Sequence, residues 1–205
     1  MTMTTSNSSF PTSLPYIAGT ASLLLYLHQR RSNPLDQREA EDIEKIAQFV
    51  ENNPDYLYRS NLKGHVCSSA LVLNEAHTHV LLTHHKKLNH WLQFGGHADG
   101  DFNLLQVALK ETEEESGLSL NQIRILSLLP IFVGAFRAPL HKEVPEHVHY
   151  DFVYLFQTEG QPTPTVSEES HDLAWVPLEE ITHPPYVHSM VRLITATQEF
   201  LKNAR

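Results

Sequence analysis

The first quarter of the chain has the hydrophobic periodicity of two helices. An apolar run that continues into polar residues predicts a helix over 17–30. A second set of apolar residues recurs every three or four positions and predicts an amphipathic helix over 34–52, with Asn33 as its N-cap and Pro34 as its first residue. Each helix has an apolar stripe, so each needs a surface to pack against.

Beyond residue 64 the pattern becomes that of strands interrupted by two more helices. Apolar runs predict strands over 65–73, 80–84, 91–94, 123–137, 148–156 and 174–176. Helical periodicity predicts helices over 103–116 and 187–201. These elements indicate an α+β fold, an α/β/α sandwich with a mixed β-sheet between helices and an N-terminal helical extension.

The length of 205 residues fits one domain with an appendage. We expect a disordered tail over 1–16, which is rich in Ser and Thr, followed by a helical extension over 17–60. The residues with candidate chemistry all fall in a domain over 61–205. The apolar stripes of the extension would be covered either by this domain or by a second copy of the chain in a homodimer.

The acidic composition narrows the classes of partner. The chain has 15 Lys and Arg against 24 Asp and Glu, a formal net charge of −9. This balance disfavours an extended nucleic-acid surface and docking on an anionic membrane. The apolar segment over 17–27 is shorter than the roughly 20 residues that cross a bilayer, and no basic residue precedes it as in a secretory signal. A single cysteine, Cys67, excludes an internal disulfide, and we expect a cytoplasmic protein.

The helix predicted over 103–116 has clear signals at both ends. Asn103 fits the N-cap position, with Gln106 placed for a reciprocal capping bond. Gly117 fits the left-handed position that follows a helix C-terminus. The predicted core-facing stripe consists of Leu105, Ala108, Leu109 and Thr112.

Three carboxylates share another face of this helix. Glu111, Glu114 and Glu115 stand at positions i, i+3 and i+4, where like charges repel. They also lie in the C-terminal half, where the helix dipole disfavours negative charge. A hard divalent cation such as Mg²⁺ would relieve the repulsion, because it prefers oxygen ligands. Helix geometry leaves a solvated acidic face open as the alternative.

The loop before this helix has three glycines within residues 95–100, which allow a close approach of the backbone to a ligand. Loop and helix together resemble the signature box of the Nudix hydrolases. The box runs over Gly96–Leu118 and keeps the family spacing without insertion, closing with the run Lys-Glu-Thr-Glu-Glu-Glu-Ser-Gly-Leu at 110–118. The resemblance implies the Nudix fold for residues 61–205.

Two positions of the box depart from the family pattern. Phe102 stands where the family has its first Glu, with Asp101 one residue earlier, and Lys110 stands where the family has Arg. In the family this Glu and this Arg brace the loop against the helix, and Lys does not replace a bidentate Arg. The double departure leaves an alternative function, a catalytically weakened Nudix-fold module that binds nucleotides or regulates.

The resemblance implies metal-assisted hydrolysis of a diphosphate linkage in a nucleoside diphosphate linked to another moiety, a small phosphate-containing substrate. It assigns catalysis to Glu111, Glu114 and Glu115. The same three residues, with the Gly96 carbonyl, would hold Mg²⁺ or Mn²⁺. One of these glutamates, or a later one, would accept the proton of the attacking water.

Polar residues outside the helix are candidates for substrate binding: His97, His149, Asp151, Glu168 and Glu169. His147, His149 and Asp151 form a row on one face of a strand. This row could bind a transition metal, hydrogen-bond a phosphate, or simply be a polar face. Glu168 and Glu169 precede the last strand, where many relatives supply an acidic residue from a loop, and a solvated loop is the alternative.

Overall fold

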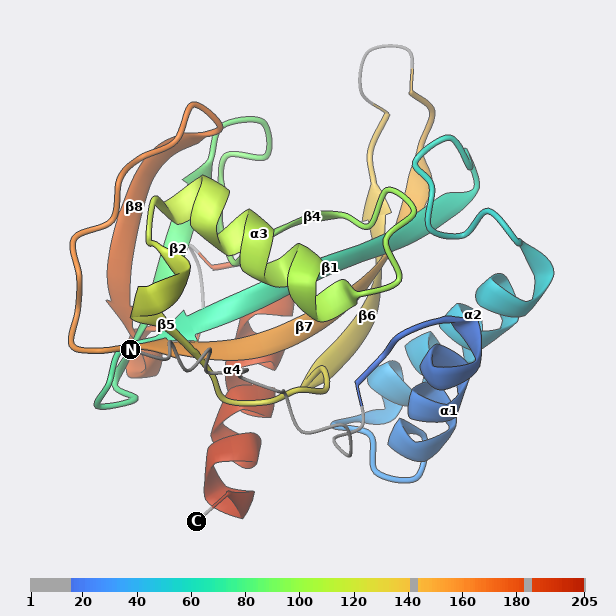
Figure 1. Ribbon diagram of the computed structural model, residues 1–205, viewed down its shortest axis with the longest axis horizontal. Helices are drawn as coiled ribbons and strands as arrows, with labels where there is room; N and C mark the ends of the chain where they lie inside the picture. Colours follow the sequence, from blue (N-terminus) through green and yellow to red (C-terminus); the bar gives the residue numbers. More distant parts are fainter. Residues whose placement is uncertain (1–15, 141–143, 183–185, 205) are drawn as a thin grey trace, which may run out of the picture.

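The computed structural model describes residues 16–140, 144–182 and 186–204 (Figure 1). The tail predicted over 1–16 lies outside these residues, apart from Tyr16. The described strands are β1 (Gly64–Leu73), β2 (His79–His85), β3 (His90–Leu92), β4 (Phe94–His97), β5 (Ile123–Ile125), β6 (Phe132–Ala138), β7 (His147–Thr158) and β8 (Ser170–Pro177). The described α-helices are α1 (Thr20–Arg30), α2 (Gln37–Asn52), α3 (Leu104–Ser116) and α4 (His188–Asn203). Short 3₁₀ turns lie at Leu120–Gln122 and Leu178–Glu180.

The described strands form one mixed sheet, as predicted. Its main path runs β3-β2-β1-β7-β5, while β4 pairs with β1, β6 with β7 and β8 with β2. β1 and β7 are parallel, in register from Gly64 opposite Val148 to Leu73 opposite Gln157, and the other pairs are antiparallel. Every residue of β1 is buried, which is expected of a strand covered on both faces.

The two faces of the sheet carry different helices, so the predicted α/β/α arrangement is confirmed. Even-numbered residues of β1 and β7, such as Ala70 and Phe152, join the core that α1, α2 and α3 complete. Odd-numbered residues, such as Leu71 and Val153, join a second core with α4. Figure 1 shows α3 in front of the sheet and α4 behind it.

The N-terminal helices pack on the sheet through apolar and polar contacts. Buried residues of α1 and α2 belong to the same core as β1 and β7: Leu23, Leu27, Ile43 and Ile46. The Tyr26 hydroxyl donates to the Pro130 carbonyl at 2.9 Å. The fully buried Glu39 carboxylate accepts from the Val133 amide at 3.1 Å and pairs with Arg30 at 3.0 Å. The sheet therefore covers the apolar stripes of the extension.

The prediction that Asn33 caps the second helix is wrong. The helix begins at Gln37, and the Asp36 carboxylate accepts from the Glu39 amide at 2.7 Å. Asp36 also pairs with Arg192 of α4 at 2.7 Å. One carboxylate thus satisfies the helix N-terminus and a tertiary ion pair, an advantage that local sequence around Pro34 does not reveal.

Two predicted strands are each divided in two. The strand expected over 91–94 is split between β3, which pairs with β2, and β4, which pairs with β1. The strand expected over 123–137 is split between β5 and β6, which pair with different parts of β7. The segment between them contains Pro130, which has no amide to donate to a ladder.

No helix in the described parts of the chain combines the length and the apolar character that a membrane span requires.

Candidate active site

The glycine loop passes close to α3. On β4, Gly95 lies opposite Ser69 and Gly96 opposite Ser68 of β1. A Cβ at Gly96 would stand 2.5 Å from the Glu111 carboxyl carbon, and one at Gly95 would collide with the Ser69 side chain. A side chain at Gly95 would clash with the backbone of β1, and one at Gly96 would displace the Glu111 carboxylate.

The three predicted glutamates lie at increasing exposure around this loop. Glu115 is buried, and its carboxylate accepts from the Gly95 amide at 3.2 Å. Glu111 is half-buried beside Gly96. Glu114 is 57% exposed and lies 3.7 Å from Lys110. Glu113 instead accepts from the Leu120 amide at 3.3 Å, beyond the helix end.

Burial, and to a smaller extent neighbouring carboxylates, disfavours the charged forms of Glu111 and Glu115. Burial raises the pKa of Glu115 to about 8, the Gly95 amide acts against this, and the charges of Glu111 and Glu169 raise it further. Burial also raises the pKa of Glu111, and the charge of Glu114 adds to this effect. A cation beside these oxygens would stabilise their ionised forms, so the donor set fits a hard divalent ion such as Mg²⁺.

The two ends of α3 lie where the sequence predicts them, but the helix turns a different set of residues toward the core than the predicted stripe. Asn103 accepts from the Gln106 amide at 3.2 Å, and Gly117 is left-handed with φ 68°. Asp101, not Gln106, satisfies the Asn103 amide at 2.8 Å. The buried apolar residues are Leu104, Val107 and Ala108, with Thr112, whereas the predicted Leu105 and Leu109 are only partly buried.

The N-terminal extension holds the loop where the usual brace is missing. Phe102 and Lys110 do not meet: Phe102 lies edge-on to Tyr56 with ring centroids 6.4 Å apart, and Lys110 pairs with Glu114. Arg59 makes a bidentate ion pair with Asp99, with the Nε–Oδ1 distance 2.7 Å.

Backbone contacts continue this bracing. The Gly100 amide donates to the Leu57 carbonyl at 3.2 Å. Gly100 has φ 92°, and a Cβ there would stand 2.7 Å from the Tyr58 ring. Residues 56–59 therefore fix the loop over Asp99 and Gly100 from outside the box.

The loop before β8 brings one of its two glutamates toward α3. Lys86 holds this loop through its amide, which donates to the Glu169 carbonyl at 3.0 Å, and through its ammonium, which donates to the Glu168 carbonyl at 2.7 Å. The Glu169 charge is close enough to raise the pKa of both Glu111 and Glu115.

The predicted row of His147, His149 and Asp151 on β7 does not form one group: the carboxylate and the two imidazoles have different partners. Asp151 is buried and accepts from the Ser69 hydroxyl at 2.7 Å and from the Gln93 amide at 3.3 Å. Burial raises its pKa to about 6, against the effect of these two hydrogen bonds. His147 and His149 instead turn to each other, with their Nε2 atoms 3.0 Å apart.

His149 belongs to a cluster that the sequence did not reveal. The histidine cluster consists of His65, Cys67, His97 and His149. Its nitrogen and sulfur donor atoms all lie within 4.8 Å of one another. Sequence spacing could not connect them, because they come from β1, β4 and β7, and only the parallel register places His65 beside His149.

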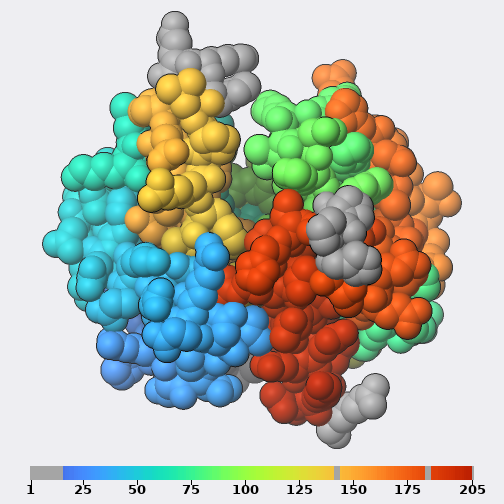
Figure 2. Space-filling model, turned by 180° about the vertical axis from the view of Figure 1, so that it is seen from behind, coloured from blue at the N-terminus to red at the C-terminus, as the bar shows by residue number. Residues whose placement is uncertain are grey.

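The histidine cluster lies on the α4 face of the sheet, since its β1 and β7 members are odd-numbered like Leu71 and Val153. α4 covers only the later residues of these strands. Figure 2 shows this face hollowed above α4, between the yellow residues of β6 and β7 and the green residues around β2 and β3.

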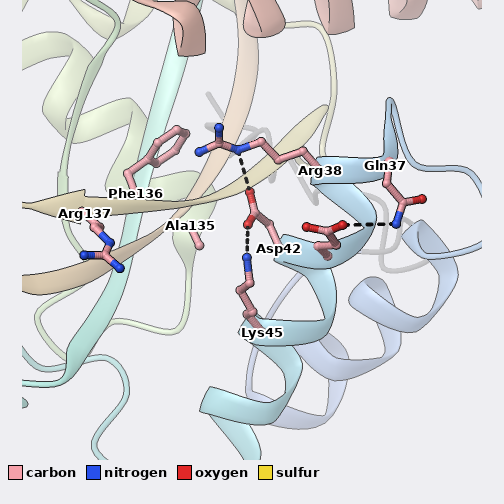
Figure 3. Close-up of a pocket in the computed structure, with 8 residues that line it drawn as sticks. Gln37, Arg38, Asp42, Lys45, Ala135, Phe136 and Arg137 are labelled. Carbon is pink, nitrogen blue, oxygen red and sulfur yellow. Dashed lines mark hydrogen bonds and ion pairs between the residues drawn. The ribbon is translucent and has the colours of Figure 1, made fainter.

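A separate groove lies between α2 and β6 (Figure 3). Asp42 lies there between Lys45, at 3.2 Å, and Arg38, at 3.9 Å. Asp42 is therefore paired with both cations, and the groove is lined by none of the predicted site residues.

The comparisons with known proteins identify the family. A family model of the NUDIX domain matches residues 63–196, and the chain belongs to the Nudix family. The m7GpppN-mRNA hydrolase NUDT17 of Xenopus laevis is 32% identical over 94 residues, 43% of this chain. The match spans 31% of that protein's length.

Solved structures show the same fold. A C. elegans Ap4A hydrolase matches with TM-score 0.53 and 18% identity over 67% of this chain and 98% of that chain. The Nudix hydrolase RenU of M. smegmatis matches with TM-score 0.53 and 16% identity, over 69% of this chain and 89% of that chain. A NUDIX family hydrolase from Clostridium perfringens matches with TM-score 0.52 and 22% identity, over 69% of this chain and 98% of that chain.

Proposed function

We propose that the protein hydrolyses a diphosphate linkage in a nucleoside diphosphate linked to another moiety, with Mg²⁺ or Mn²⁺ as cofactor. The observation that carries this proposal is the gathering of three glutamates around the glycine loop, with Glu115 bonded to the Gly95 amide. Glu115 is buried and Glu111 is half-buried, and keeping both carboxylates charged there is costly without a cation. It is therefore better explained by a metal site than by a solvated acidic face.

Glu111, Glu114 and Glu115 are the proposed metal ligands, with the Gly96 carbonyl as a further donor. A bound divalent ion would polarise the phosphoryl oxygens and neutralise charge that develops during attack by water. The chain's own residues keep this arrangement in place. The close packing of Gly96 on Glu111 positions one carboxylate, and the Gly95 amide positions another.

A carboxylate of this group accepts the proton of the attacking water. Glu169 is our candidate outside α3, because its charge acts on Glu111 and Glu115 from a separate loop. The substrate contacts proposed from the sequence, His97, His149 and Asp151, lie on the other face of the sheet from Glu111, so we propose no direct contact between them and the diphosphate.

The name of one relative supports this substrate class. NUDT17 is named as an m7GpppN-mRNA hydrolase. We propose a substrate of that general kind, a nucleoside joined through at least two phosphates to a second group. The alternative, a catalytically weakened module that binds nucleotides or regulates, was suggested by the departures at Phe102 and Lys110. The ion pair between Arg59 and Asp99 braces the loop in another way, so this alternative has less support.

The test is product release from a panel of nucleoside diphosphate compounds with and without Mg²⁺. We expect cleavage in Mg²⁺ and loss of cleavage in excess EDTA. A Glu115→Gln variant should lose activity, and Glu113→Gln is the matched control on the same helix. Full activity in EDTA would contradict the metal assignment, and no cleavage of any compound by a folded chain would favour the binding module.

The division into a tail, an extension over 17–60 and a Nudix domain over 61–205 is part of this proposal, as are a cytoplasmic location and a homodimer. Sedimentation of the full chain tests the oligomeric state. The extension already packs on the sheet, so the homodimer does not need the stripes of α1 and α2 as its interface.

A further inference from the structure

The histidine cluster has the donor atoms of a transition-metal site. Three imidazoles and one thiol converge from three strands, with their donor atoms within 4.8 Å of one another. In a tetrahedral Zn²⁺ site, ligand atoms at about 2.0–2.3 Å from the ion lie about 3.3–3.8 Å apart. A displacement of less than about 1 Å for each donor atom would bring the four atoms to these distances, and small adjustments of the side-chain torsions supply such a displacement.

His65 gives a second and independent sign of a ligand. Its side chain is 2% exposed, and neither ring nitrogen has a hydrogen-bond partner among the described residues. Its ring centroid lies 4.7 Å from that of His97 and 4.8 Å from that of His149. A buried imidazole without partners is costly, and a metal ion at the centre of the cluster would bind one of the two His65 nitrogens.

The surrounding charge favours a cation over a phosphate. The carboxylates of Asp151 and Asp99 lie close enough to Cys67 to act on its thiol. Arg59, whose charge also acts on Cys67, is committed to its bidentate pair with Asp99. Thiol and imidazole donors suit Zn²⁺ better than Mg²⁺, which takes oxygen ligands.

We propose that the histidine cluster binds Zn²⁺ as a structural site that ties β1, β4 and β7 together. Binding would exchange the Cys67 S–H bond for a zinc–thiolate bond and release the proton to solvent. Four donors leave the coordination closed, as in structural sites. Because His97 directly follows Gly96, the ion would also fix the strand from which the glycine loop departs.

The site is separate from the proposed hydrolysis. Gly96 and His97 are consecutive on β4, so their side chains point to opposite faces of the sheet. The glutamates lie on the Gly96 side. A variant that loses Mg²⁺ chemistry should therefore keep Zn²⁺, and failure of one proposal would leave the other standing.

The experiment measures metal binding by the full chain without a histidine tag. Equimolar Zn²⁺ should bind at about one ion per chain, resist excess Mg²⁺, and raise the Tm by roughly 5–10 °C at a hundredfold excess over its dissociation constant. Co²⁺ should give the visible bands of tetrahedral coordination and a thiolate charge-transfer band in the near ultraviolet.

Two substitutions test the ligands. Cys67→Ser should abolish the charge-transfer band, and His97→Gln, at a partly exposed position, should weaken zinc binding by 10-fold or more, on the order of losing one ligand. His171→Gln is the matched control, because His171 lies on β8 outside the cluster. Circular dichroism without metal establishes that each variant is folded. Unchanged binding in both variants, or a folded wild-type chain that takes up no Zn²⁺, would overturn the proposal.

Discussion

The two sides of β4 present opposite chemistries within one residue of each other. On the Gly96 side are the carboxylates of Glu111 and Glu115, supplied by one helix. On the His97 side is the histidine cluster, whose nitrogen and sulfur donors come from three strands. The first donor set is hard and anionic, and the second is borderline and largely neutral.

The difference shows which kind of site a single sequence reveals. The glutamates follow one another at helical spacing, so a helical wheel is enough to group them. The members of the histidine cluster are separated by up to 84 residues, from His65 to His149, and meet only through strand register. A site built across a sheet is visible only once the pairing of strands is known.

The largest expected effect concerns the carboxylates. Glu115→Gln and Glu114→Gln should each lower kcat by about 10²-fold or more, the order typical of losing one catalytic group. Glu111→Gln should also be damaging, since Glu111 packs directly on Gly96. Steady-state kinetics in saturating Mg²⁺ measures these changes.

Glu113→Gln is the control, and it should be nearly silent because the Glu113 carboxylate accepts from the Leu120 amide beyond the helix end. If Glu113→Gln were as harmful as Glu114→Gln at equal thermal stability, the site would not be on the face we assign. Retention of Zn²⁺ by all four variants would sharpen the comparison between the two sides of β4.

A smaller effect is expected from the loop brace. Arg59→Ala removes the bidentate pair with Asp99, and we expect kcat to fall by roughly 10-fold as the glycine loop loses its fixed position. Stability should change little, because exposed ion pairs contribute only about 0–1 kcal/mol. Kinetics and thermal unfolding of the same protein separate the two effects.

The family pair offers a rescue of this variant. Adding Phe102→Glu and Lys110→Arg to Arg59→Ala should recover part of the lost rate by restoring the brace from within the box. The same double substitution in the wild-type chain should leave activity equal or higher. No recovery in a folded triple variant would show that residues 56–59 do not replace the family brace.

Much of the architecture could be predicted because its signals are local. The caps at Asn103 and Gly117 and the alternation along β7 lie within single elements, and both predictions are confirmed. The errors arose where tertiary contacts decided the outcome. Asp36 replaced Asn33 as a cap because its carboxylate also reaches Arg192.

The site divides in the same way. Glu111, Glu114 and Glu115 could be grouped from sequence, although the burial of Glu115 and the exposure of Glu114 could not. The sequence alone showed that Phe102 and Lys110 depart from the family pattern. It did not show that an Arg59–Asp99 ion pair braces the loop in their place, because Arg59 lies 40 residues before Asp99 and outside the recognised box.

The smallest expected effect on turnover follows from a substitution in the histidine cluster. Cys67→Ser should lower kcat in saturating Mg²⁺ by roughly threefold, less than the ~10–100-fold that follows loss of a group directly orienting a catalytic metal ligand. The reason is position: Cys67 lies opposite His97 on the neighbouring strand, and its influence reaches Gly96 only through the backbone of β4. The same variant should unfold at a lower temperature than wild type in Zn²⁺ and at a similar temperature in its absence, because the ion stabilises only the state that binds it. A loss of turnover as large as that of Glu115→Gln, with folding intact, would mean that the two sides of β4 form one site and not two.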